Sequence, residues 1–270
     1  MDFSIIIPCY NSGKYLPDAL NSIEPATTGR TFTYEVIIVD DGSTDPLTKD
    51  LLARLATEGK YTVLSQKNGG PAAARNTGIR KAQGEYLIFL DSDNRLKPHF
   101  IDKMFAVQQQ YKRDIIHGRA EFFGDTTEAR FHTGHFDINK IIAENYIDIC
   151  CLIRREVMEK TGGFDDERLI MGFEDWEFFI NAHAMGFTFC YIDEPIYDYR
   201  VLASSLSQQH TYEHIQEVKQ YVYRKHIKSF VGAFEWYYAQ DVMYRADIRR
   251  PFRSFAKYLY RKYWRRISGN

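Results

Sequence analysis

The 270-residue sequence lacks several features that would place it in whole classes of protein. No apolar stretch approaches the roughly 20 residues that a membrane-spanning helix needs. The first residues do not read as a secretory signal peptide, because Asp2 and Ser4 interrupt a short apolar run. The four cysteines have no metal-like spacing, which indicates buried thiols in a reducing compartment. We therefore expect a cytoplasmic protein, or one attached peripherally to the inner face of a membrane.

The sequence also lacks an excess of charge of either sign. Its 35 basic and 36 acidic residues leave a net charge of -1, and we expect no nucleic-acid partner. The distribution is uneven, however, because nine basic residues and only Asp247 on the acidic side follow residue 243. Such asymmetry points to an anionic surface as a partner.

The same C-terminal stretch is rich in aromatic residues. A single helical stripe would hold Phe252, Phe255, Leu259, Tyr263 and Ile267, because they are spaced by three or four residues. This stripe fits three roles that the sequence leaves open: packing on the rest of the chain, an oligomer interface, or a peripheral helix on an anionic membrane surface.

The first 95 residues alternate between strand and helix patterns. Short apolar runs typical of buried strands occupy residues 3–8, 34–39, 61–64 and 86–90. Asp45 and Pro46 have the pattern of an N-cap followed by proline at the first helical position, and Pro71 opens another helix. Such alternation predicts an α/β fold with a mostly parallel central sheet flanked by helices.

The second half of the chain is less regular. Further strands are expected near residues 115–116, 121–123, 149–153 and 187–192, and a helix is expected to begin at Glu174 and Asp175. From about residue 212 the sequence becomes helical, basic and aromatic. We assign residues 1–211 to one domain, with halves of about 1–95 and 96–211, and residues 212–270 to a helical C-terminal extension.

Polar residues follow each of the four early strands. In open α/β sheets, ligands bind at the carboxyl ends of the strands, so the coincidence predicts a site for a polar ligand. Asp91 and Asp93 would project to the same side of an extended chain, where two unpaired carboxylates are costly to bury and favour a bound cation. An Asx-type turn with a capping aspartate is the alternative interpretation.

Six short motifs occur in an order and spacing that match a known family. They are Ile-Ile-Ile-Pro-Cys-Tyr-Asn at 5–11, Val-Asp-Asp-Gly-Ser-Thr-Asp at 39–45, Asn-Gly-Gly-Pro-Ala-Ala-Ala-Arg-Asn at 68–76, Leu-Asp-Ser-Asp at 90–93, Gly-Gly-Phe-Asp at 162–165 and Glu-Asp at 174–175. Across residues 1–205 the sequence resembles the family 2 inverting glycosyltransferases, which have the Rossmann-like GT-A fold. The resemblance implies transfer of a hexose or N-acetylhexosamine from a nucleotide sugar, above all a UDP-sugar, to a hydroxyl of a glycan, lipid-linked or protein acceptor.

The resemblance also implies roles for residues of the donor half. Tyr10 would lie against the base, Asp41 would accept a hydrogen bond from uracil with Asp40 in support, and Arg75 would reach the base or the diphosphate. Asp91 would contact the ribose. The remaining donor-site residues would be Pro8, Asn11, Asn68 and Ser92. Without the motif, Arg75 would read as part of a solvated helix face.

In the acceptor half the resemblance makes Asp175 the catalytic base, with Glu174 and Trp176 at the acceptor. Acidic residues at a helix start also complement the helix dipole, and Trp176 suits a core position equally well. Asp93 would hold a divalent cation, Mn²⁺ or Mg²⁺, which prefers oxygen ligands and offsets charge on a departing diphosphate. One departure concerns this metal, since Leu202 stands where the family often has a histidine.

Two other functions compete with this interpretation. A nucleotidyltransferase also uses a Rossmann-like sheet with paired carboxylates, but no glycine-rich loop carrying Lys or Arg follows the first strand to bind a triphosphate. A sugar-nucleotide-binding module without turnover would need neither Asp93 nor Asp175. The sequence favours the glycosyltransferase.

Overall fold

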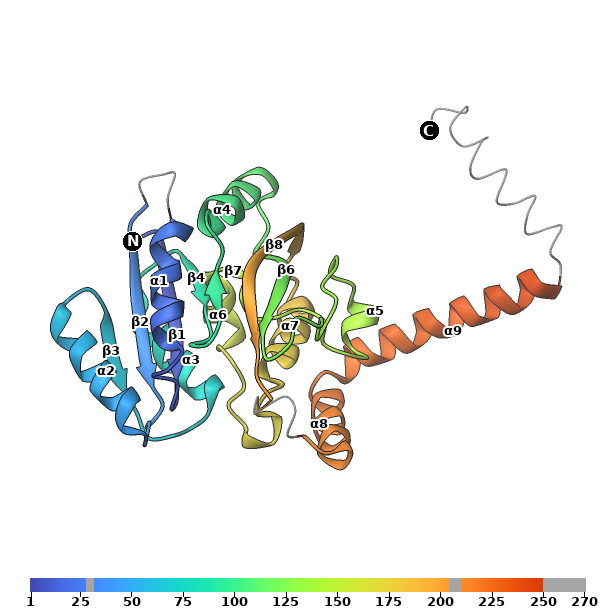
Figure 1. Cartoon of the computed structure of the whole chain (residues 1–270). Coiled ribbons are helices and arrows are strands. Elements are labelled where there is room, and N and C mark those ends of the chain that lie inside the picture. The colour runs from blue at the N-terminus through green and yellow to red at the C-terminus, as the bar shows by residue number, and fades with distance from the viewer. Residues whose placement is uncertain (28–31, 204–209, 250–270) are drawn as a thin grey trace. The chain divides into compact units, whose positions relative to one another are not determined.

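The computed structural model describes residues 1–27, 32–203 and 210–249 (Figure 1). Its described part contains an eight-stranded sheet with the order β3-β2-β1-β4-β7-β6-β8-β5. The strands are β1 (Phe3–Cys9), β2 (Tyr34–Asp40), β3 (Thr62–Ser65), β4 (Tyr86–Phe89), β5 (Arg95–Leu96), β6 (Ile115–Gly124), β7 (Leu152–Arg154) and β8 (Phe189–Val201).

Helices cover both faces of this sheet. The helices of the unit that holds the sheet are α1 (Leu16–Ala26), α2 (Pro46–Glu58), α3 (Pro71–Lys81), α4 (Phe100–Tyr111), α5 (Ile138–Ile141), α6 (Arg155–Thr161), α7 (Glu174–Ala184) and α8 (Tyr212–Lys225), with a 3₁₀ helix η1 (Arg168–Ile170). Helix α9 (Ile227–Arg249) belongs to a separate unit. The arrangement confirms the predicted α/β class and the GT-A type of sheet.

Strand β1 lies at the centre of the parallel part of the sheet. It pairs in parallel with β2 and with β4, and Ile5, Ile6 and Ile7 are each 0% exposed. Ile5 and Ile7 join a core cluster with residues of α1, α2 and α4, whereas Ile6 meets α3, where Gly78 allows a close approach. Both faces of β1 are therefore covered, which explains its continuous apolar sequence.

The helix starts follow the sequence signals. The Asp45 carboxylate accepts a hydrogen bond from the Thr48 backbone N–H at 2.9 Å, and Pro46 occupies the start of α2. Pro71 also lies at the start of its helix, α3, which has no side-chain cap. The predicted N-cap at Asp45 and both predicted helix starts are confirmed. Proline suits the first helical position because the N–H that it lacks has no intrahelical partner there.

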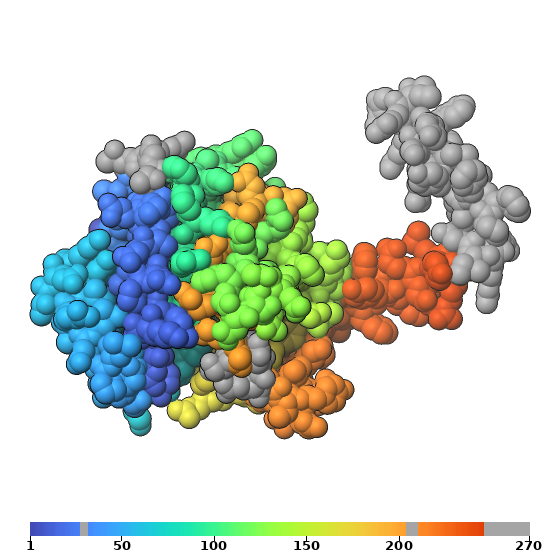
Figure 2. All heavy atoms as spheres, in the orientation of Figure 1, coloured from blue at the N-terminus to red at the C-terminus, as the bar shows by residue number. Residues whose placement is uncertain are grey.

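The second half of the sheet reverses direction at β7. This strand pairs antiparallel with both β4 and β6, while β6 and β8 run parallel to each other. The two short strands expected near residues 115–116 and 121–123 form one strand, β6, and β8 extends well beyond the expected residues 187–192. Residues 149–151, expected to be strand, are irregular instead. In the space-filling view, the N-terminal βα units (blue) and the segment that begins at β6 (green) both lie on the side of the molecule that faces the viewer (Figure 2).

The chain divides into two compact units, residues Met1–His226 and Ile227–Asn270. Helix α8, which the sequence assigns to the extension, belongs to the first unit. In the second unit, α9 exposes large side chains that include Phe234, Tyr238 and Tyr244. The predicted stripe from Phe252 to Ile267 lies outside the described residues. Among the residues that are described, no helix has the length and apolarity that crossing a bilayer requires.

Candidate functional site

The carboxyl ends of the four parallel strands meet at one edge of the sheet. Backbone hydrogen bonds join them: Asp41 N–H donates to the Cys9 carbonyl at 2.9 Å, and Gln66 N–H donates to the Asp40 carbonyl at 2.9 Å. Leu90 N–H donates to the Ile6 carbonyl at 3.0 Å. The residues that follow these strands therefore gather at this edge, as the sequence predicts.

The two residues after β1, Tyr10 and Asn11, are exposed to solvent at this edge. Tyr10 is 48% exposed, so its ring is free to meet a planar ligand. Asn11 has a left-handed backbone with φ of 50°, and its side-chain oxygen accepts hydrogen bonds from the N–H groups of Thr44 (2.7 Å) and Asp45 (3.0 Å). Asn11 thus fixes the loop after β2 against the loop after β1. Pro8, the second-to-last residue of β1, is half-buried.

The two aspartates at the end of β2 have different environments. Asp41 is 3% exposed, and its carboxylate accepts hydrogen bonds from Gln66 Nε2 and from the backbone N–H groups of Gly69 and Gly70, each at 2.8 Å. Asp40 accepts one from the Ser43 N–H at 2.9 Å. Asp41 therefore shapes the turn after β3, on which Asn68 is exposed. Its contact with uracil stays a prediction.

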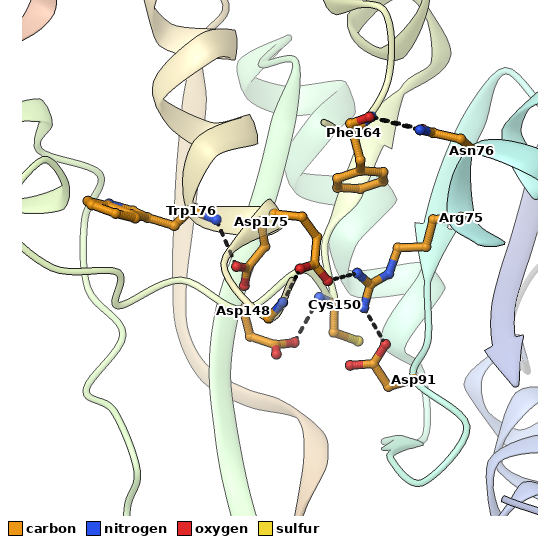
Figure 3. A network of polar contacts seen from close by, with 10 residues as sticks. Arg75, Asn76, Asp91, Asp148, Cys150, Phe164, Asp175 and Trp176 are labelled. Carbon is orange, nitrogen blue, oxygen red and sulfur yellow. Dashed lines mark hydrogen bonds and ion pairs between the residues drawn. The ribbon is translucent and has the colours of Figure 1, made fainter. Parts of the chain in front are cut away.

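Arg75 lies at the centre of the site (Figure 3). Its Nη1 is 2.6 Å from Glu174 Oε1 and its Nη2 is 2.6 Å from Asp91 Oδ1. The residue is 4% exposed, so the solvated-face interpretation is wrong. Burial alone would lower the pKa of the guanidinium, but the charges of Asp91 and Glu174 outweigh it and raise that pKa. Arg75 therefore joins α3, the end of β4 and the start of α7.

The segment after β4 is a turn and not an extended chain. Asn94 N–H donates to the Asp91 carbonyl at 3.0 Å, so the argument that Asp91 and Asp93 project together from an extended strand is wrong. The two carboxylates are still close enough to interact, since burial and the charge of Asp91 raise the pKa of Asp93 to about 6. Ser92 faces inward and accepts a hydrogen bond from Ser12 Oγ at 2.7 Å.

The first turn of α7 presents one acidic residue to the site and buries its neighbours. Glu174 is 4% exposed and accepts hydrogen bonds from Arg75 and from the Gly172 N–H, which leaves it a positioning role. Trp176 is 2% exposed, and its indole N–H donates to the Ile141 carbonyl. Both side chains are enclosed by the protein, so the structure gives no support to the acceptor contacts of Glu174 and Trp176, which stay predictions.

Asp175 is the partly exposed residue of that turn. Its Oδ1 accepts a hydrogen bond from the Trp176 N–H at 2.7 Å. Burial, followed by the charges of Glu174 and Asp148, raises its pKa well above the usual range, and Arg75 offsets part of this. A carboxylate with a raised pKa is a stronger base than a solvated one.

Asp148 is a site residue that the sequence analysis does not identify. It lies beside Asp175 and Asp91 (Figure 3), and burial together with the charge of Asp91 raises its pKa to about 7. The one signal in the sequence is a single aspartate inside an apolar run, Tyr-Ile-Asp-Ile-Cys-Cys at 146–151. That pattern does not distinguish a functional carboxylate from a turn residue.

The chain leaves β8 next to Asp93. Arg200 Nε donates to the Asp93 carbonyl at 2.9 Å, and its Nη2 is 2.6 Å from Asp18 Oδ2. Leu202 follows, and residues 204–209 lie outside the described part. His210 packs on the Phe173 ring at a centroid distance of 4.8 Å. Within the described residues no group of three or more His, Cys, Asp or Glu side chains is arranged to hold a metal ion.

Comparisons with known proteins agree with this geometry. The family model "Glycosyl transferase family 2" matches residues 4–170. The glycosyltransferase GlyG of Streptococcus pneumoniae is 37% identical over 116 residues, which are 43% of this chain and 38% of GlyG. The poly(ribitol-phosphate) β-N-acetylglucosaminyltransferase TarS of Staphylococcus aureus is 33% identical over 118 residues, 43% of this chain and 20% of TarS.

Solved structures show the same fold. A crystal structure of S. aureus TarS residues 1–349 in complex with UDP has a TM-score of 0.64 at 23% identity, covering 81% of this chain and 63% of that one. The corresponding complex with UDP-GlcNAc also gives 0.64, at 21% identity, covering 81% of this chain and 65% of that one. The chain spans less than two thirds of each of these relatives.

Proposed function

The chain belongs to glycosyl transferase family 2, and from this premise we propose that it transfers one sugar, with inversion, from a UDP-sugar to a hydroxyl of a glycan, lipid-linked or protein acceptor. The observation that carries the proposal is the position of Asp175. Arg75 pairs both with Glu174, the residue before Asp175, and with Asp91 of the donor half, so Asp175 lies close to the donor edge. The raised pKa of Asp175 suits a general base.

The proposed reaction is a single displacement. Asp175 accepts the proton of the acceptor hydroxyl, and the oxygen forms a bond to the anomeric carbon of the donor. The bond from that carbon to the diphosphate breaks on the opposite side, and UDP leaves with the electron pair. One in-line attack inverts the anomeric centre and needs no nucleophile from the protein. Holding acceptor and donor in this alignment is itself a large part of catalysis.

A divalent cation, Mn²⁺ or Mg²⁺, fits the residues after β4. Asp93 is a partly buried carboxylate beside Asp91, and within the described residues no lysine or arginine side chain forms an ion pair with it. Hard cations often use one or two protein carboxylates together with substrate phosphates. We therefore assign Asp93 as the protein ligand, and the cation, when bound, offsets charge on the diphosphate. Calorimetry checks this: Mn²⁺ should bind the free protein weakly and together with UDP, whereas tight binding without UDP would contradict it.

UDP-N-acetylglucosamine is the first donor to try, since the TarS structures of the same fold contain UDP and UDP-GlcNAc. Tyr10 is the proposed platform for the uracil ring, with Asp41, Asn11 and Asn68 around it. The C-terminal stretch is basic and aromatic, and we propose that it associates peripherally with an anionic inner membrane surface. Such an association would favour a lipid-linked acceptor.

The test is a pair of variants assayed for UDP release and for sugar transfer. Asp175→Asn keeps the shape of the side chain and removes its basicity, so kcat should fall by about 10²-fold or more while UDP affinity changes little. Asp166→Asn, an exposed aspartate nine residues earlier, is the matched control and should leave kcat unchanged. Near-normal transfer by Asp175→Asn would reject the base. A wild-type protein that binds UDP but releases no sugar would favour a binding module without turnover.

A further inference from the structure

Sheet topology brings a second carboxylate to the proposed base. Strand β7 pairs antiparallel with β4, with Leu152 opposite Ile88. The residues before β7 therefore lie at the same edge as the residues after β4, which places Asp148 next to Asp91. In Figure 3 the carboxylates of Asp148 and Asp175 lie near each other, to the left of Arg75, and the charge of Asp148 contributes to the raised pKa of Asp175. The reaction proposed above uses Asp175 and assigns nothing to Asp148.

The Asp148 carboxylate is held in place without being neutralised. Its Oδ1 accepts a hydrogen bond from the Cys150 N–H at 2.9 Å. Within the described residues no lysine or arginine forms an ion pair with Asp148, although Arg75 is close enough to offset part of the cost of its burial. A partly buried carboxylate kept in this way is costly for the fold. Such a cost is typical of a group that meets a ligand.

Two tyrosines of β8, Tyr197 and Tyr199, lie close enough to Asp148 for its charge to raise the pKa of each phenol. The Tyr197 hydroxyl is buried next to Asp148 and makes no well-formed hydrogen bond within the described part of the chain. The Tyr199 ring packs edge-on against Phe131 at 5.4 Å. Burial, and then the charges of Asp148, Asp91, Asp93 and Asp175, raise the pKa of Tyr199, so its phenol stays a hydrogen-bond donor among these acceptors.

We propose that Asp148 and Tyr199 form an acceptor subsite that binds the hydroxyl adjacent to the one that reacts. Asp175 would face the reacting hydroxyl, Asp148 would accept a hydrogen bond from its neighbour, and the Tyr199 phenol would donate to that neighbour. The acceptor class is therefore a molecule with two adjacent hydroxyls, such as a sugar or a polyol. This inference rests on the proposed transfer reaction and names its acceptor more closely.

A site built around a substrate hydroxyl rejects analogues that lack it, because its buried polar groups are then left unpaired. Glycerol and 1,3-propanediol provide the probes, since they have the same carbon chain and only glycerol has adjacent hydroxyls. UDP release from UDP-N-acetylglucosamine is measured with each at matched concentrations. We expect the wild type to prefer glycerol about tenfold in kcat/KM, in the range of a hydrogen bond to a charged group.

In Asp148→Asn the ratio of kcat/KM for glycerol to kcat/KM for 1,3-propanediol should fall close to one, chiefly because the KM for glycerol rises. Tyr199→Phe should lower this ratio about threefold and serves as the second variant if Asp148→Asn does not fold. Asp198→Asn is the matched control on the same strand, because Asp198 pairs with Arg95 and Lys97 away from the site. This control should keep the wild-type preference.

The outcomes separate the two proposals. If the wild type releases UDP with both alcohols but shows no preference, or if Asp148→Asn keeps the preference, the subsite is wrong and the transfer function stands. If no UDP-sugar is turned over with any acceptor, the transfer function itself is wrong. A large loss of Mn²⁺ affinity in Asp148→Asn, measured by calorimetry with UDP present, would make Asp148 a metal ligand and overturn the subsite.

Discussion

The guanidinium of Arg75 and the carboxylate of Glu174 lie 2.6 Å apart, although 99 residues separate them in sequence. Arg75 comes from α3 in the first half of the chain, and Glu174 begins α7 in the second. Because Asp175 is the next residue, this ion pair sets the position of the proposed base relative to the donor edge. Both side chains are about 5% exposed, so the pair is shielded from water.

Arg75→Gln should destabilise the protein strongly, because it leaves Asp91 and Glu174 facing each other without a positive charge. Removal of one partner from a buried ion pair costs about 3–5 kcal/mol. The exposed pair of Lys103 and Glu194 provides the control, and Lys103→Gln should cost less than about 1 kcal/mol. Urea unfolding measures both values. Equal losses in the two variants would show that the buried pair has no special role in stability.

The sequence predicts the parallel half of the fold well because each element there has a local signal. Apolar runs mark β1 to β4, and Pro46 and Pro71 mark helix starts. The apolar run at residues 149–153 predicts a strand, but only its last two residues belong to β7, and nothing in the run indicates the antiparallel pairing with β4. The sharing of Arg75 between Asp91 and Glu174 depends on that pairing, so no local pattern reveals it.

The site residues divide in the same way. Tyr10 and Asn11 lie at a strand end, and their position follows from the sheet alone. Whether Trp176 faces the core or a ligand depends on how α7 is rotated about its own axis, which the sequence does not give. In the structure the indole N–H donates to the Ile141 carbonyl, so Trp176 faces the core. Asp148 is missed because its partners come from β4 and α7, both distant in sequence.

Tyr10→Ala should weaken UDP binding with little effect on folding. The ring is 48% exposed, and stacking of a base on an aromatic side chain contributes about 1–3 kcal/mol, so UDP affinity should fall by about tenfold or more. Tyr111→Ala, at the end of α4 and 53% exposed, is the control and should bind UDP normally. Calorimetry with UDP and GDP measures both variants. If Tyr10→Ala binds UDP as the wild type does, the base lies elsewhere.

Asp148→Asn should stabilise the ligand-free protein most at pH 8, less at pH 5, and have little effect below pH 4. The folded-state pKa of Asp148 is raised to about 7, whereas an unfolded aspartate has a pKa near 3.9. Between these values the folded state holds a proton that the unfolded state releases, so this group makes stability fall as pH rises. Asparagine can still accept the Cys150 hydrogen bond and carries no charge.

Thermal unfolding of the wild type and Asp148→Asn across this pH range tests the sign. His117, buried and uncharged, has a pKa lowered to about 3 and opposes the trend in both proteins, so the difference between them isolates Asp148. A melting temperature for Asp148→Asn that is lower than that of the wild type at pH 8 would show that the carboxylate stabilises the fold and is not kept at a cost.

The C-terminal stretch should bind anionic membranes through its positive charges. Each Lys or Arg near such a surface contributes roughly 1 kcal/mol, and the contribution falls with salt. The full chain should therefore sediment with liposomes containing phosphatidylglycerol at low salt, and less at high salt or with neutral liposomes. Changing Arg261, Lys262, Arg265 and Arg266 to glutamine keeps the apolar stripe and should abolish most of this binding.

A chain that ends at Arg249 keeps α9 and removes the stripe. If this chain and the glutamine variant both sediment as the full chain does, any membrane contact belongs to α9, whose Phe234 and Tyr238 are exposed. That result would reject the basic stretch as the anchor.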